Sequence, residues 1–166
     1  MHYINFFYIL LVINIMITNI NCIKIENPKK FMSDVNIDLF GNFKYILIEM
    51  TNKTNLNDYK YLVRGSTKFD YHKSLFRNFM QNSVYKFPEI YSSFSFRIIG
   101  GGRISVYSNN ITVYGSSGYY VAANHKLTCN LIKLAFPSYN CIALWLNKIS
   151  WKNFFKYCTI YQFNLC

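Results

Sequence analysis

The stretch RIIGGGRISVYSNNITVYG, from Arg97 to Gly115, decides the fold because it predicts two β-strands joined by a tight turn. Residues typical of strands lie on both sides of Asn109 and Asn110, a pair that favours a hairpin turn. Three consecutive glycines, at positions 100–102, cost backbone entropy inside a strand and need a structural reason. We expect a bulge there, or another segment passing close to the backbone. The stretch indicates antiparallel sheet.

Further strands and two helices are expected on either side of this hairpin. Thr67 and Asp70 have the spacing of a capping box, and the apolar residues that follow lie on one helical face, so a helix is predicted over about 68–82. A second helix is predicted from Thr128, ending before Pro137. The remaining apolar runs predict strands at 40–50, 59–65 and 141–146.

Composition indicates one globular domain with a basic surface. The chain has 166 residues, of which 52% are hydrophobic and 19% aromatic, enough for a buried core. It carries 18 Lys and Arg against 7 Asp and Glu, a net charge of +11. This charge is typical of proteins with phosphorylated, nucleic-acid or anionic-lipid partners, but equally of a basic surface that only keeps the protein soluble. We expect a domain over 33–146, preceded by a basic spacer at 23–32.

Residues 1–22 have the features of a signal peptide. They contain no Lys, Arg, Asp or Glu, and a nearly unbroken apolar run extends from Phe6 to Ile17. This run is shorter than the roughly 20 apolar residues that a membrane-spanning helix needs. We expect a cleaved secretory signal, with an uncleaved anchor as the second reading and an upstream extension as the third. The protein is secreted if the segment is used, and cytoplasmic otherwise.

Residues 147–166 form a basic, aromatic tail. Lys148, Lys152 and Lys156 recur every four residues beside Trp151, which predicts a helix with a basic stripe. This tail either packs as a terminal helix or lies on an anionic membrane or partner. Membrane association is expected only through this tail or the amino-terminal segment.

Missing motifs exclude several kinds of phosphate chemistry. The chain has no G-x-x-x-x-G-K-[ST] loop, no cysteine followed six residues later by arginine, and no G-x-S-x-G elbow. Its five cysteines form no C-x-x-C pair, their connectivity stays open, and acidic residues do not cluster near His72 or His125. The sequence therefore predicts a site without metal or cofactor, built from a histidine, basic side chains and backbone amides.

Three stretches together carry a resemblance to a known family. They are DVNIDLFGNFKYILIEM, YLVRGSTKFDYHKSLFRNFMQ and IIGGGRISVYSNNITVYGSSGYYVAANHKLTCNLIKLAFPSYN. In the order F-K-Y, V-R-G, Y-H, G-G-G-R-I-S and V-Y-G-S-S they resemble the phosphohistidine phosphatase family, also called janus/ocnus. The resemblance covers roughly 33–146. It implies a compact α/β (α+β) domain, a mixed sheet with one helix on each face, that hydrolyses the phosphorus–nitrogen bonds of phosphohistidine and phospholysine without a metal.

The resemblance also implies roles for particular residues. His72, in Y-H, matches the catalytic histidine of the family, as general base or nucleophile. The substrate-binding positions implied are Lys44, Arg64, Ser117, Gly118, Tyr119 and His125. A loop rich in Gly and Ser presents backbone N–H groups that bind phosphate oxygens, and basic side chains add charge-assisted hydrogen bonds. Cations also keep a neighbouring imidazole neutral, as a general base requires.

One departure and several structural readings stay open. Gly118 and Tyr119 stand where the family pattern leads us to expect a larger and a small residue, so Tyr119 either crowds the phosphate or offers only its N–H. Without the resemblance, His72 reads as a residue of a first helical turn, and His125 as one that holds the loop to the second helix. Arg103 either faces solvent or closes the pocket.

Three functions compete on the sequence alone. The first is a monomeric phosphatase acting on phosphohistidine-containing proteins. The second is a secreted, catalytically weak member of the same fold that binds phosphate or anionic peptides, for example because Tyr119 narrows the pocket. Nucleic-acid binding is the third and has least support, because no RNP-like motif accompanies the charge. We therefore expect no nucleic-acid partner.

Overall fold

The computed structural model describes residues 28–144, so the leader and the tail lie outside the described residues. A 3-10 turn, η1 (Pro28–Phe31), belongs to a separate amino-terminal unit, and the domain begins at Ser33. The domain contains six strands and three α-helices. In chain order its elements are β1 (Val35–Ile37), β2 (Gly41–Asn52), β3 (Tyr59–Ser66), α2 (His72–Phe79), the π-turn η2 (Met80–Val84), α3 (Pro88–Ser93), β4 (Phe94–Tyr107), β5 (Asn110–Tyr114), α4 (His125–Ala135) and β6 (Asn140–Ala143).

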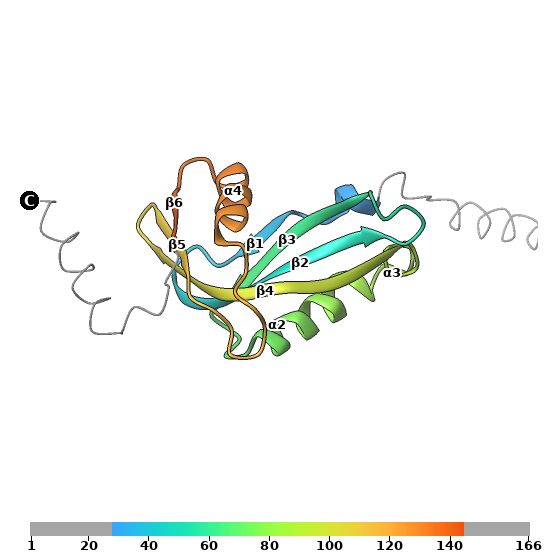
Figure 1. Ribbon diagram of the computed structural model, residues 1–166, viewed down its shortest axis with the longest axis horizontal. Coiled ribbons are helices and arrows are strands. Elements are labelled where there is room, and N and C mark those ends of the chain that lie inside the picture. The colour runs from blue at the N-terminus through green and yellow to red at the C-terminus, as the bar shows by residue number, and fades with distance from the viewer. Residues whose placement is uncertain (1–27, 145–166) are drawn as a thin grey trace, which may run out of the picture. The chain divides into compact units, whose positions relative to one another are not determined.

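The six strands form one mixed sheet in the order β1-β3-β2-β4-β5-β6. The central pairs β3–β2, β2–β4 and β4–β5 are antiparallel, whereas β1 and β6 join the two edges in parallel. Figure 1 shows α2 and α3 on one face of the sheet and α4 on the other. The expected α+β class and mixed sheet are confirmed, but one face carries two helices where one was expected. The short strand β1 and helix α3 were not predicted from the sequence.

Helix α2 begins later than the capping-box pattern predicts. Tyr71, in extended conformation, is the N-cap and gives no side-chain cap, while the Thr67 N–H and hydroxyl both donate to Asp38. Burial raises the pKa of Asp38, but the hydrogen bonds from Thr67 and Ser66 and the charge of Lys68 together outweigh it, and the net pKa lies below its ordinary value. Thr67 and Asp70 therefore belong to a turn tied to the strand region, and the prediction of a helix from residue 68 is wrong.

The three glycines lie in one long strand, β4, where other groups approach both faces. The register between β2 and β4 shifts beside Leu47, so the expected bulge is present. A Cβ on Gly100 would lie 2.4 Å from Ala123 Cα, because the segment after β5 runs along the edge of β4 here. A Cβ on Gly101 would lie 2.9 Å from the His72 ring, and one on Gly102 would lie 3.0 Å from the His125 ring. Larger residues would therefore displace these neighbours.

The core between the sheet and α4 is apolar and contains a disulfide. Tyr45, Leu47, Val63 and Ile132 are fully buried there. A disulfide joins Cys129 of α4 to Cys141 of β6, a pairing that the sequence left open. Closing a loop of this length contributes about 3 kcal/mol to stability.

The helices of the described region are short. Within residues 28–144, none is both long and apolar enough to cross a bilayer.

Candidate active site

His72 is placed by the buried stripe of α2. Leu75 and Phe79 follow it at the i+3 and i+7 positions, and all three side chains are buried toward the sheet. The histidine therefore stands at the first turn of the helix with its ring directed onto β4, over Gly101. His72 is held at the start of α2 because it lies on the buried face through which the helix packs on the sheet.

The partners of the His72 ring define its tautomer. Nε2 lies 3.1 Å from the carbonyl oxygen of Gly102, which can only accept, so Nε2 carries the hydrogen and donates. In the neutral ring Nδ1 is then the acceptor, and it receives the Ser117 hydroxyl at 3.2 Å. The basic lone pair of the ring is thus on Nδ1.

The loop between β5 and α4 brings Ser117 to this nitrogen. Figure 1 shows this segment passing beside β4 toward α2 before it returns to α4. Val121 accepts from Gly101 N–H and Ala123 donates to Gly101 carbonyl, so the loop pairs with β4 where β5 has ended. Ser117 Oγ also accepts the N–H groups of Tyr119 and Tyr120, at 3.2 and 3.1 Å. These bonds hold the serine hydroxyl at His72.

Two cations lie directly opposite each other on neighbouring strands beside this histidine. Lys44 of β2 pairs with Arg103 of β4, two residues along from the Gly101 against which the ring lies. Like charges in this position repel each other, and an anion bound between them relieves the repulsion. Both line a cavity of about 280 Å³ together with Asn42, Phe43, Thr67, Phe69, Asp70 and Tyr71. His72 and Ser117 are not among the residues that line this cavity, and the two cations give it positive charge on the side that faces the histidine cluster.

Burial and the two cations keep His72 neutral. Burial lowers the pKa of His72, the hydrogen bond to Gly102 partly opposes this, and the positive charges of Lys44 and Arg103 lower the pKa further. The imidazole is therefore unprotonated near neutral pH, with a lone pair on Nδ1.

Tyr119 does not fill the site. Its side chain is 85% exposed, and a Cβ on the preceding Gly118 would meet nothing within 4 Å. The loop N–H groups of Tyr119 and Tyr120 are both bonded to Ser117. The unusual tyrosine thus projects into solvent.

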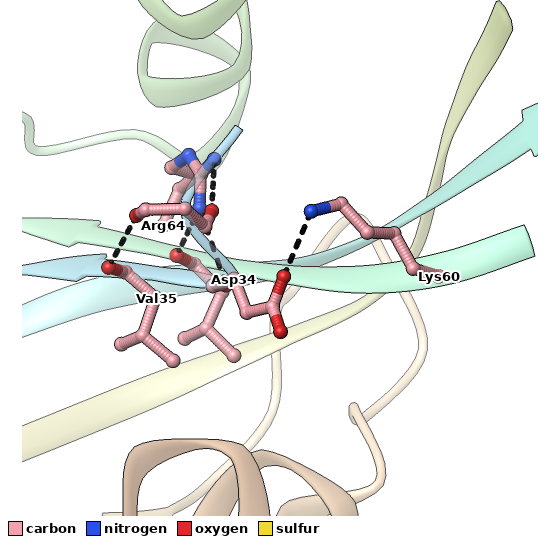
Figure 2. A network of polar contacts seen from close by, with 6 residues as sticks. Asp34, Val35, Lys60 and Arg64 are labelled. Carbon is pink, nitrogen blue, oxygen red and sulfur yellow. Dashed lines mark hydrogen bonds and ion pairs between the residues drawn. The ribbon is translucent and has the colours of Figure 1, made fainter. Parts of the chain in front are cut away.

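The structure does not bring Arg64 into this cluster. Its guanidinium donates to the backbone carbonyls of Ser33, Asp34 and Val63 (Figure 2). The guanidinium also lies 5.0 Å from the ring centroid of Phe79, at the other end of α2. Burial lowers the pKa of Arg64 to about 10, and the nearby carboxylate of Asp34 partly opposes this. In this structure Arg64 fastens β1 to β3.

His125 lies on the opposite face of the sheet. Its Nε2 donates to the Gly115 carbonyl at 2.8 Å, and Nδ1 accepts the Tyr45 hydroxyl at 2.6 Å. Burial lowers the pKa of His125, although the bond to Gly115 opposes it. The ring is 2% exposed and anchors the start of α4 and the end of β5 to β2, so the structure supports the holding role considered from the sequence.

Arg103 is the residue of this cluster that the sequence did not assign. Its motif, G-G-G-R-I-S, was identified, but which neighbour it faces depends on the register between β2 and β4. A pairing of strands separated by some 60 residues cannot be read from either segment alone.

No metal cluster accompanies these groups. Between residues 28 and 144, no three His, Cys, Asp or Glu side chains are grouped so that they could hold a metal ion.

Comparison with known proteins identifies the family. The family model of the Janus/Ocnus family matches residues 29–140. The chain belongs to the Janus/Ocnus family. It is 33% identical over 113 residues to a 14 kDa phosphohistidine phosphatase of Sus scrofa, covering 64% of this chain and 85% of the relative. It is 30% identical over 126 residues to the protein of that name in Homo sapiens, covering 72% of this chain and 90% of the relative.

Family membership confirms the resemblance stated from the sequence motifs. The matched residues include the whole of the cluster around His72 and the loop that carries Ser117. The family thus supports a phosphatase function for this fold. The reaction of this particular chain depends on the geometry of its own site.

Proposed function

We propose that this member of the Janus/Ocnus family is a protein histidine phosphatase that hydrolyses phosphorus–nitrogen bonds without a metal. One observation carries the proposal: a neutral His72, with its lone pair on Nδ1, lies beside the opposed cations Lys44 and Arg103. The cations bind the phosphoryl oxygens through charge-assisted hydrogen bonds, and the imidazole accepts a proton near neutral pH. Phospholysine carries the same kind of bond and is a second substrate.

In the proposed reaction, water attacks phosphorus and gives its proton to His72 Nδ1. The phosphorus–nitrogen bond then breaks, and the leaving nitrogen of the substrate takes the proton from His72 Nδ1, so that orthophosphate, an unmodified side chain and a neutral His72 result. Since the Ser117 hydroxyl donates to Nδ1, it either moves aside or relays the proton. In the covalent route, Nδ1 attacks phosphorus and water hydrolyses the phosphohistidine formed on the enzyme. Rapid quenching with radiolabelled substrate separates the routes, because only the second labels the protein.

The catalytically weak binding member remains a second candidate, and one observation favours it. The Nδ1 atom and the N–H groups of Tyr119 and Tyr120 are all occupied by Ser117. A site in which these bonds never open binds phosphate through Lys44 and Arg103 without turning over.

The deciding experiment measures phosphate release from a phosphohistidine peptide in the presence of EDTA. A phosphatase releases phosphate at the same rate with and without the chelator, and the parallel phosphoserine peptide serves as the control substrate. Phosphate affinity without release from the phosphohistidine peptide, or from a phospholysine peptide measured in the same way, selects the binding member instead. Loss of release in EDTA, restored by a divalent cation, contradicts the metal-independent mechanism.

We also propose that the protein is secreted, from two independent features. Residues 1–22 have the composition of a signal peptide, and the domain contains a disulfide between Cys129 and Cys141. Disulfides persist in oxidising compartments and are rare in the cytosol. Amino-terminal sequencing of the native protein should find a start between about residues 19 and 24. An intact Met1 on cytosolic protein would overturn this proposal.

A further inference from the structure

Tyr119 is the most exposed large hydrophobic residue of the described domain, at 85%. An aromatic ring in this position gains free energy when a second planar group covers it, both from burial of its surface and from ring–ring attraction. Tyr119 follows Ser117 in the loop beside the candidate active site, so a ligand bound at that site could cover its ring.

The backbone of Tyr119 is fixed relative to His72. Its N–H donates to Ser117 Oγ at 3.2 Å, and the same oxygen lies 3.2 Å from His72 Nδ1. One oxygen atom thus connects the main chain of Tyr119 with the nitrogen proposed to act on the substrate. The ring therefore begins two residues from a group that touches the candidate catalytic histidine.

Three rings run in a row from His72 to the surface. The His72 and Tyr120 rings meet edge to face, with centroids 6.3 Å apart and planes at 80°. Tyr120 and Tyr119 meet in the same way, at 5.2 Å and 76°. The space beside the row is open at Gly118, where a Cβ would have no neighbour within 4 Å. A ligand ring can therefore reach Tyr119 without displacing a side chain of the loop at that point.

We propose that Tyr119 is a substrate-binding residue on which the imidazole ring of phosphohistidine stacks. This inference rests on the proposed function. The loop of Tyr119 reaches His72 through Ser117, so a phosphoryl group that extends from Lys44 and Arg103 to His72 Nδ1 would bring the ring that carries it to this loop. A phospholysine side chain can occupy the phosphoryl site equally well, but its alkyl chain has no aromatic face. Tyr119 therefore gives this chain selectivity for phosphohistidine over phospholysine.

The test compares Tyr119→Ala, Tyr119→Phe and the parent in the full-length protein. Calorimetric titration uses two peptides of one sequence, one with a phosphoryltriazole and one with phosphoserine. The triazole is a hydrolysis-resistant planar mimic of phosphohistidine, whereas phosphoserine has the phosphate but no ring. Tyr107→Ala is the matched control, because Tyr107 is 74% exposed at the carboxyl end of β4, outside the loop that carries Ser117 and Tyr119. Turnover of phosphohistidine and phospholysine peptides is measured in parallel.

Tyr119→Ala should weaken triazole binding by about 3- to 10-fold and leave phosphoserine binding unchanged, as expected for the loss of one aromatic pair. Tyr119→Phe should bind like the parent, and Tyr107→Ala should change nothing. Equal losses on both peptides, or none on either, overturn the stacking role. Turnover judges the proposed function separately: a parent that binds the triazole through Tyr119 but hydrolyses neither nitrogen-linked substrate retains the ring-binding site and refutes the phosphatase.

Discussion

The two buried histidines of the domain have nearly the same local environment on opposite faces of one sheet. Each begins a helix, each donates from Nε2 to a glycine carbonyl, and each accepts a hydroxyl at Nδ1. Their rings press against adjacent residues of β4, His72 on Gly101 and His125 on Gly102. Hydrogen bonding alone does not distinguish a catalytic histidine from a structural one.

The difference lies in what surrounds the acceptor nitrogen. Nδ1 of His125 meets Tyr45, which is fully buried, and the Tyr45 hydroxyl also accepts from Thr128 inside the core. Nδ1 of His72 meets a serine on a loop, and the ring lies near two cations, Lys44 and Arg103, which also line a cavity. The proposed function therefore rests on the loop partner and the nearby cations of His72, which His125 lacks.

Exchanging each histidine for alanine should give the largest contrast. His72→Ala should lower turnover of a phosphohistidine peptide by about 10²-fold or more and keep phosphate affinity, because a general base or nucleophile is lost. His125→Ala should lower the free energy of unfolding by about 2 to 3 kcal/mol, because the Tyr45 hydroxyl and Gly115 carbonyl lose buried partners. Turnover and urea unfolding are measured for both. If folded His72→Ala turns over the peptide within a few-fold of the parent rate, His72 is not the catalytic histidine and does not differ from His125 in this respect.

Removing either cation should test whether the face of the sheet that carries His72 binds phosphate. Lys44→Ala and Arg103→Ala should each weaken phosphate binding by about 1.5 to 3 kcal/mol through the loss of a charge-assisted hydrogen bond. Their stability should be unchanged or slightly higher, since two opposed like charges are reduced to one.

Two arginine variants are the controls for this binding experiment. Arg97→Ala removes an exposed guanidinium that pairs with Glu49, and should leave phosphate affinity unchanged. Arg64→Ala should also keep phosphate affinity but should unfold more easily, since Arg64 holds three backbone carbonyls. Weakened phosphate binding by Arg64→Ala would place that residue in the site after all.

Adding a methyl group between the two histidines should separate activity from stability. In Gly101→Ala the new Cβ lies 2.9 Å from the His72 ring, so the ring must move and turnover should fall. In Gly102→Ala it lies 2.8 Å from both the Tyr45 ring and the Tyr114 carbonyl oxygen, so the free energy of unfolding should fall by about 1 to 3 kcal/mol. Turnover per folded molecule, with unfolding curves, tests this. The opposite pattern would mean that His125 controls the site.

The smallest effect should appear on acidification, where both histidines act alike. The folded-state pKa of each lies below the ordinary 6.5, so the unfolded chain binds protons first as pH falls. The stability associated with the two neutral rings is therefore complete above pH 6.5 and decreases below it. Urea unfolding at pH 7.5 and 5.5 should show this loss, and either alanine variant should lose less. The fall of turnover on acidification, by contrast, should depend on protonation of His72 and not on protonation of His125.

The sequence by itself determined every described strand except β1, as well as the class of the domain and the family. Hydrophobic patterns and turn residues are local, so β2, β3 and the hairpin of β4 and β5 could be expected from neighbouring residues. The motifs also singled out His72, Lys44 and Ser117, which the fold brings close together. Lys44 of β2 lies directly opposite Arg103 of β4 in the sheet.

Only the tertiary structure decided which basic groups share that site. Arg64 and Arg103 each lie in a strand beside a glycine, and no feature of the neighbouring sequence tells which of the two belongs to the site. The register of β2 against β4 sets Arg103 opposite Lys44, whereas the carbonyls at the start of β1 take the guanidinium of Arg64. The two histidines likewise differ by the face of the sheet that each helix covers. Such differences come from contacts between segments far apart in the chain, and no local pattern encodes them.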